Sequence, residues 1–132
     1  MMEKTYSFIA VFDYADDGIS IEFPDLPGCF SAADTTEEAV RHAKEAMGLH
    51  LWGMEKDGDE IPVPSELKDV QLESNQLPCL IAVFMPPVRL RLDKAFVKKT
   101  LSVPAWLNAE AENRGVNFSH VLQQGLRDYL DL

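Results

Sequence analysis

The chain has 132 residues, of which 46% are apolar, enough for one core with at most a small second module. No run approaches the roughly 20 apolar residues of a membrane span, and the first ten residues do not read as a signal peptide, so we expect a cytoplasmic protein without membrane contact. Cys29 and Cys79 stand far apart and no histidines cluster, so we expect neither a disulfide, a metal nor a cofactor.

The net charge of −10 is distributed unevenly along the chain. Residues 1–86 hold 5 Lys/Arg against 17 Asp/Glu, net −12, whereas residues 87–132 hold 7 against 5, net +2. An acidic N-terminal part repels phosphate and attracts a basic partner, while the C-terminal part can approach DNA. The charge pattern therefore indicates that the N-terminal part contacts a basic partner and the C-terminal part contacts DNA.

The first elements are predicted to form a hairpin that packs on a helix. Strand-like runs at residues 6–12 and 19–23 flank the turn sequence "DYADDG", and a short strand is expected at residues 30–33. Thr35 and Glu38 have the spacing of a capping box, which predicts a helix over residues 36–56. Its apolar residues recur at helical spacing, and Gly58 with Pro62 ends it.

The stretch "FPDLPGCF" at residues 23–30 allows two interpretations, and they are compatible. Two prolines fix the backbone and a glycine relaxes it, which is typical of a rigid turn after a strand. A rigid, acidic and partly apolar loop also suits contact with a basic protein partner.

The next stretches are predicted to complete a sheet. The apolar run "CLIAVFM" at residues 79–85 is typical of an interior strand, and the double proline after it suggests a boundary. Val88, Leu90 and Leu92 alternate with two arginines, which predicts a strand at the sheet's edge. Residues 93–95 are then a linker between an α+β domain, 1–92, and a second domain, 93–132.

The second domain is predicted to be a strand followed by two helices. In "FVKKTLSV" Leu101 and Val103 lie on one side of the strand, while Lys98, Thr100 and Ser102 lie on the other. Pro104 starts a helix, Gly115 stops it, and Asn117 caps the next one. About 36 residues cannot bury these apolar faces alone, so we expect dimerisation, with Gly125 permitting a close helix crossing.

This C-terminal pattern resembles the ribbon-helix-helix DNA-binding family, whose paired strands enter the major groove. Together with "PDLPGC", "TTEEA" and "DGDEIPVPS", nearly the whole chain resembles a HicB antitoxin, the partner of the small HicA ribonuclease toxin. The resemblance implies a partial, inactive RNase H-like body that blocks the toxin, and a dimeric or tetrameric C-terminal module that binds the operon's own promoter DNA.

The resemblance also implies roles for individual residues. Side chains facing DNA bases are those of Lys98, Thr100 and Ser102, and a phosphate is held by backbone amides of Asn117, Phe118 and Ser119. A shift of one residue in the strand would instead present Lys99 and Leu101. Toxin contact falls on Phe23, Pro24, Asp25, Leu26 and Pro27. Dimer contact falls on Leu101, Val103, Leu122, Gly125 and Leu126.

Two other functions are open for the same residues. A stand-alone transcriptional regulator would use the N-terminal domain for a ligand or for oligomerisation. A metal-dependent nuclease would need converging acids, for which Asp13, Asp16, Asp17, Glu22 and Asp25 are the candidates, although a solvated acidic face explains them as well. His50 and Trp106 are predicted to pack in the core, and Cys29 lacks a basic neighbour that would make it a nucleophile.

Overall fold

The structure is a computed structural model that describes residues 2–132. It divides into two compact units, residues 1–96 and residues 97–132. The first unit contains a four-stranded antiparallel sheet in the order β3-β2-β1-β4. Its strands are β1 (Thr5–Ala15), β2 (Gly18–Glu22), β3 (Phe30–Ala33) and β4 (Gln76–Phe84). This α+β architecture agrees with the class expected from the sequence.

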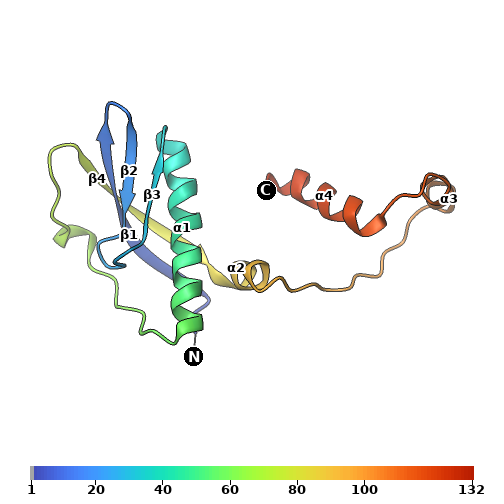
Figure 1. Ribbon diagram of the computed structural model, residues 1–132, viewed down its shortest axis with the longest axis horizontal. Helices are drawn as coiled ribbons and strands as arrows, with labels where there is room; N and C mark the ends of the chain where they lie inside the picture. Colours follow the sequence, from blue (N-terminus) through green and yellow to red (C-terminus); the bar gives the residue numbers. More distant parts are fainter. Residues whose placement is uncertain (1) are drawn as a thin grey trace. The chain divides into compact units, whose positions relative to one another are not determined.

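The long helix α1 (Thr36–Asp57) lies along one face of this sheet (Figure 1). The Thr35 side chain accepts a hydrogen bond from the Glu38 amide, so the predicted capping box is confirmed. At the other end Gly58 adopts a left-handed conformation with φ 73°, which a glycine tolerates best, and its amide closes the helix. Both ends of α1 are therefore fixed by the residues that the sequence indicated.

The core of the first unit lies between α1 and the inner face of the sheet. Phe8, Phe12 and Ile21 of the strands and Met47 and Leu51 of α1 are all at most 3% exposed. Burying side chains of this size stabilises the fold by about 1.5 to 3 kcal/mol each. Cys29 joins this core, and burial raises the pKa of its thiol to about 11, so it is protonated at neutral pH and is no nucleophile.

The outer face of the sheet is partly covered by the segment that connects α1 to β4. Ser65 donates two hydrogen bonds to the Asp25 carboxylate, from its amide at 2.8 Å and from its hydroxyl at 2.7 Å. A short 3-10 turn, η1 (Leu67–Asp69), follows in the same segment. Ile9 and Val11 point to this outer face and are nevertheless buried, at 2% and 3% exposure.

Two predictions for residues 79–92 are wrong. The strand β4 forms, but it lies at the edge of the sheet and not in its interior. Residues 88–92 are no strand; they belong to helix α2 (Met85–Leu92), in which Pro86 and Pro87 occupy the first turn. Prolines are tolerated there because the first amides of a helix have no partner within it.

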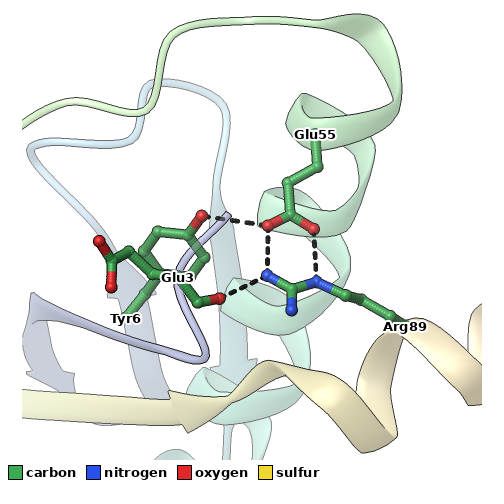
Figure 2. Close-up of polar contacts among 4 residues, drawn as sticks. All are labelled: Glu3, Tyr6, Glu55 and Arg89. Atoms are coloured by element: carbon green, nitrogen blue, oxygen red, sulfur yellow. Dashed lines mark hydrogen bonds and ion pairs between the residues drawn. The ribbon is translucent and has the colours of Figure 1, made fainter. Parts of the chain in front are cut away.

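Helix α2 is attached to α1 by a cluster of four residues (Figure 2). Arg89 donates to both carboxylate oxygens of Glu55, at 2.9 Å and 2.7 Å, and also to the backbone oxygen of Glu3. The Tyr6 hydroxyl donates to Glu55 at 3.1 Å. The hydrogen bonds from Arg89 hold the pKa of Glu55 below its usual value, although burial opposes this.

A second contact fixes the end of α2. Asp93, expected to lie in a linker, accepts a hydrogen bond from the Trp52 indole at 3.1 Å and pairs with Lys56 at 2.9 Å. Val88 packs against Gly48 of α1, where an added Cβ would lie 3.4 Å from the valine. Helix α2 is therefore the last helix of the first unit.

The second unit holds two helices, α3 (Ala105–Asn113) and α4 (Phe118–Leu130). The Asn117 side chain accepts from the His120 amide at 3.0 Å, which confirms the predicted cap of α4. Gly115, with φ 66°, makes the turn between the helices. Trp106 is 69% exposed, so its predicted place in a core is wrong for the single chain.

Candidate protein and nucleic-acid interfaces

The turn after β2 is held by its own backbone. The amides of Phe23, Leu26 and Cys29 bond to the carbonyls of Cys29, Phe23 and Leu26, at 3.2, 2.9 and 3.0 Å. Gly28 adopts φ 89°, which favours glycine. The sequence "FPDLPGCF" is therefore a turn whose apolar side chains anchor it in the core.

This turn brings only part of the predicted toxin-contact set to the surface. Phe23 and Leu26 are 2% and 1% exposed, so their side chains belong to the core. Asp25 is half-buried, and its carboxylate oxygens already accept hydrogen bonds from Ser65. Pro24 and Pro27 are exposed, so they are the members of the set that a partner protein can reach directly.

A groove of about 500 Å³ lies beside this turn, on the outer face of the sheet. Residues directly opposite one another in antiparallel strands share a face, and Glu22 pairs with both Val11 and Phe30. Phe30, at the edge, is 72% exposed. The residues that line this groove on the outer face, called the acidic groove below, are Val11, Asp13, Ser20, Glu22, Pro24 and Phe30.

Most residues that line the acidic groove come from a stretch of sequence without basic side chains. Residues 5–40 contain eight Asp or Glu and no Lys or Arg. The Asp13 carboxylate accepts hydrogen bonds from Asn75 and Gln76, which hold it at one end of the groove. The absence of cations over residues 5–40 was a signal in the sequence for this surface, but it did not single out Phe30.

The acidic residues do not converge on a metal site. Among residues 2–132 no group of three or more His, Cys, Asp or Glu side chains lies close enough to hold an ion. Asp16 and Asp17 form the hairpin turn between β1 and β2. His50 is half-buried at a separate cavity next to Leu49 and Asp57, and His42 bonds to the Ala32 carbonyl at 2.8 Å.

The second unit has an apolar groove of its own, of about 610 Å³, called the C-terminal groove below. No residue of α3 or α4, both described throughout, is buried, and Leu101 and Leu126 are 60% and 52% exposed. The residues that line the groove are Lys99, Leu101, Val103, Leu107, Ala111, Val116, Phe118, Ser119, Val121 and Leu122. A surface this apolar on so small a unit is typical of an interaction site.

Residues 97–103 have no regular secondary structure in the single chain, so the predicted strand stays a prediction. Lys99, Leu101 and Val103 line the C-terminal groove, whereas Lys98, Thr100 and Ser102 do not. A Cβ added at Gly125 would meet no atom within 4 Å, so nothing in the single chain requires a glycine there. Asn117, Phe118 and Ser119 stand at the start of α4, and Leu122 and Leu126 follow on it.

Within residues 2–132, no helix combines the length and apolar character that crossing a membrane requires.

Residues 8–124 match the family described as HicB-like antitoxin of bacterial toxin-antitoxin system. An uncharacterised 14.9 kDa protein of Haemophilus phage HP1 is 35% identical over 92 residues, which are 70% of this chain and 68% of that protein. Antitoxin HicB 2 of Photorhabdus laumondii is 33% identical over 64 residues, 48% of this chain and 46% of that protein.

The fold is also similar to that of a chain in a solved toxin-antitoxin complex from Streptococcus pneumoniae. The TM-score is 0.57 at 20% sequence identity, and the alignment covers 95% of this chain and 99% of the other. At this identity the likeness extends to the fold and not to individual contacts.

Proposed function

Because this chain belongs to the HicB-like antitoxins of bacterial toxin-antitoxin systems, a family of non-enzymatic proteins, we propose that it neutralises a small, basic HicA-type ribonuclease toxin in the cytoplasm. The single observation that carries the proposal is the family match over residues 8–124. We also propose that the first unit is a partial RNase H-like domain. The whole protein is proposed to repress its own operon's promoter.

The acidic groove is the surface proposed for the toxin. A protein that binds RNA needs positive charge, and an acidic surface attracts that charge and competes with RNA for it. Phe30 provides an exposed aromatic anchor beside Glu22, and interface energy concentrates in such anchors. Pro24 is part of this surface, whereas the buried Phe23 and Leu26 support it from below.

The first experiment is a ribonuclease assay on the small toxin encoded beside this chain, with and without an equimolar amount of the antitoxin. We expect RNA cleavage to stop and a stable complex to form. Persistent cleavage, or the absence of a complex, would contradict the antitoxin role and would favour the stand-alone transcriptional regulator.

Replacing Phe30 by lysine is expected to weaken toxin binding by about 2 kcal/mol, roughly 30-fold, because it removes the anchor and adds a cation to a surface for a basic partner. Isothermal titration with the toxin measures the change. The matched control is Leu49→Lys. It adds the same positive charge in place of a leucine on α1 that is 56% exposed. A loss of binding in the control alone would place the toxin on the cavity beside α1.

For the second unit we propose a ribbon-helix-helix dimer that binds promoter DNA. The exposed apolar lining of the C-terminal groove supports burial against a second copy, with Leu101, Val103, Leu122, Gly125 and Leu126 in that contact. The alternation of Lys99, Leu101 and Val103 toward the groove supports a register in which Lys98, Thr100 and Ser102 face the DNA bases.

Replacing Lys98 or Thr100 by alanine is expected to weaken binding to the operator by about 1 to 3 kcal/mol each, since each change removes a contact to a base edge. Gel-shift titration against operator and unrelated DNA measures the specific part. Lys99→Ala is the matched control, because it removes the same charge from the neighbouring position. A larger loss of specificity for Lys99→Ala than for Lys98→Ala would show that the strand is shifted by one residue.

A further inference from the structure

Two neighbouring rows of side chains build the acidic groove on the outer face of the sheet. In one row Asp13 of β1 pairs with Ser20 of β2. In the next row Val11 of β1 pairs with Glu22 of β2, which pairs with Phe30 of β3. Cβ atoms within a row are about 5 Å apart, and those of diagonal neighbours such as Asp13 and Glu22 are roughly 7 to 8 Å apart. The small Ser20 and the buried Val11 form a low floor between the two carboxylates and the Phe30 ring.

The Asp13 carboxylate is held in a fixed orientation. The Asn75 amide group donates to its Oδ1 at 2.5 Å, and the Gln76 amide group donates to its Oδ2 at 3.1 Å. Gln76 is also the β4 partner of Asp13, so it lies in the same row. A carboxylate offers about four acceptor positions on its two oxygens, so two donors leave room for two more. The plane of the Asp13 carboxylate is therefore set in advance, while both oxygens can still accept a bidentate donor.

The two carboxylates of the groove have no cation of their own chain beside them. Among the residues that the structure describes, ion pairs are formed by the carboxylates of Glu55, Asp93 and Glu110. The Phe30 ring at the side of the groove is 72% exposed. The groove therefore presents two negative charges and an open aromatic ring to a cation from another molecule.

An arginine side chain fits this arrangement better than a lysine side chain. The guanidinium is planar, presents five donors in a fixed fork and stacks on aromatic rings, whereas the lysine ammonium is a compact point charge. One edge of a guanidinium can pair with Asp13 while its remaining donors reach Glu22 and its face lies against Phe30. At this separation of the carboxylates a single ammonium pairs well with only one of them, and it has no flat face to stack.

We propose that the acidic groove is a binding site for one arginine side chain of the toxin, with the guanidinium between Asp13 and Glu22 and stacked on Phe30. Asn75 and Gln76 are positioning residues, because they act through Asp13. The inference rests on the proposed function, since it names the chemical group that holds a basic toxin at the surface proposed for it. Charge complementarity selects this occupant, because an acidic groove attracts a cationic side chain and repels nucleic acid and other acidic surfaces.

The first test needs no toxin. The isotope-labelled full chain is titrated with N-acetyl-arginine amide and, separately, with N-acetyl-lysine amide at constant ionic strength, and the chemical shifts of its backbone amides are followed by NMR. We expect the arginine probe to shift the amides of Val11, Ser20 and Phe30, and the lysine probe to bind about tenfold more weakly. Equal binding of the two probes, or shifts spread evenly over the acidic surface, would overturn the arginine site.

Variants of the full chain separate stacking and orientation from net charge. Phe30→Trp should keep the preference for the arginine probe, whereas Phe30→Leu, which retains an apolar side chain, should lose most of it. Asn75→Ala should reduce the preference although the net charge is unchanged, because Asp13 loses a donor that orients it. Asp16→Asn removes one charge from the hairpin turn, outside the groove, and should leave the preference unchanged. A preference that falls for Asp16→Asn and not for Phe30→Leu or Asn75→Ala would overturn the proposal.

A double-mutant cycle tests the same contact in the complex with the toxin. Each arginine of the toxin is replaced by lysine in turn, and one of these changes should weaken binding to the wild-type chain about tenfold but have little effect on binding to Glu22→Gln or Asp13→Asn. If the toxin binds and none of its arginines is coupled to Glu22 or Asp13, the arginine site is overturned while the antitoxin role stands. Failure of the toxin to bind, while the arginine probe still occupies the groove, would overturn the proposed function and leave the site itself standing.

Discussion

Replacing Glu55 by alanine is expected to lower the free energy of unfolding of the first unit by about 3 kcal/mol, because Arg89 loses its partner while it remains largely buried. The side chains of Glu55 and Arg89 are only 5% and 19% exposed. Tyr6 loses its acceptor as well. Urea denaturation followed by circular dichroism measures the change.

The control for this variant is the neighbouring pair of Lys56 and Asp93, whose side chains are 53% and 38% exposed. Lys56→Ala should cost at most about 1 kcal/mol, as exposed ion pairs usually do. The double change of Glu55 and Arg89 to methionine should cost less than Glu55→Ala alone, because it leaves no unpaired charge. If Glu55→Ala unfolded with the same urea midpoint as the wild type, the stabilising role of the cluster would be contradicted.

The effect of Glu55 should depend on pH in one direction. Its pKa is lowered in the folded protein, so the stabilisation is complete above the unfolded value of about 4.3 and is lost as the pH falls toward the lower folded value. The difference in stability between wild type and Glu55→Ala should therefore be full at neutral pH and shrink in acid. A difference that grows in acid would contradict this sign.

A chain that ends at Phe96 is expected to bind and neutralise the toxin as well as the full chain does, and to lose operator binding completely. The first unit ends at this residue, and its core and the acidic groove lie before it. The residues proposed to face DNA bases, Lys98, Thr100 and Ser102, all follow it. Titration with the toxin and a gel shift with the operator, on the same preparation, measure the two activities.

The matched comparison is a chain that ends at Val88. It lacks Arg89 and Asp93, so α2 loses both contacts to α1 and Glu55 is left without its cation. We expect this shorter chain to unfold at lower temperature, although it also contains every residue of the acidic groove. Residual operator binding by the chain that ends at Phe96 would contradict the assignment of DNA recognition to the second unit.

Local signals in the sequence predicted the helix α1 and the first hairpin well. Capping at Thr35 and termination at Gly58 depend on contacts within a few residues, so spacing alone identifies them. Position within the sheet depends on distant partners. The sequence therefore predicted that β4 is a strand and placed it wrongly in the interior.

The stretch after β4 shows why short patterns mislead. Alternation of Val88, Leu90 and Leu92 over five residues matches a strand, but Val88 and Leu92 are also one helical turn apart. The two prolines before them indicated a helix start as strongly as a domain boundary. Long-range pairing of Arg89 with Glu55, which no local pattern reveals, accompanies the helix.

The toxin contact predicted for the turn at residues 23–27 stays a prediction, and the structure shows only which of its side chains are exposed. Its prolines reach the surface, but Phe23 and Leu26 are core residues, since an apolar residue in a turn can anchor it as well as meet a partner. The acidic groove could not be predicted from the sequence. Val11, Glu22 and Phe30 are distant in sequence and become neighbours only when three strands pair.

The exposed helices of the second unit bear on how long the protein lasts in the cell. Neither α3 nor α4, which are described throughout, buries a side chain within the single chain, so by itself this unit has little to oppose its unfolding. Association with another copy would bury these side chains. By mass action, the associated fraction rises as the protein accumulates. Proteases cleave unfolded segments, so degradation should be fastest when the protein is scarce. The abundance of the protein would then reinforce itself through slower turnover, which acts opposite to the proposed repression of its own synthesis.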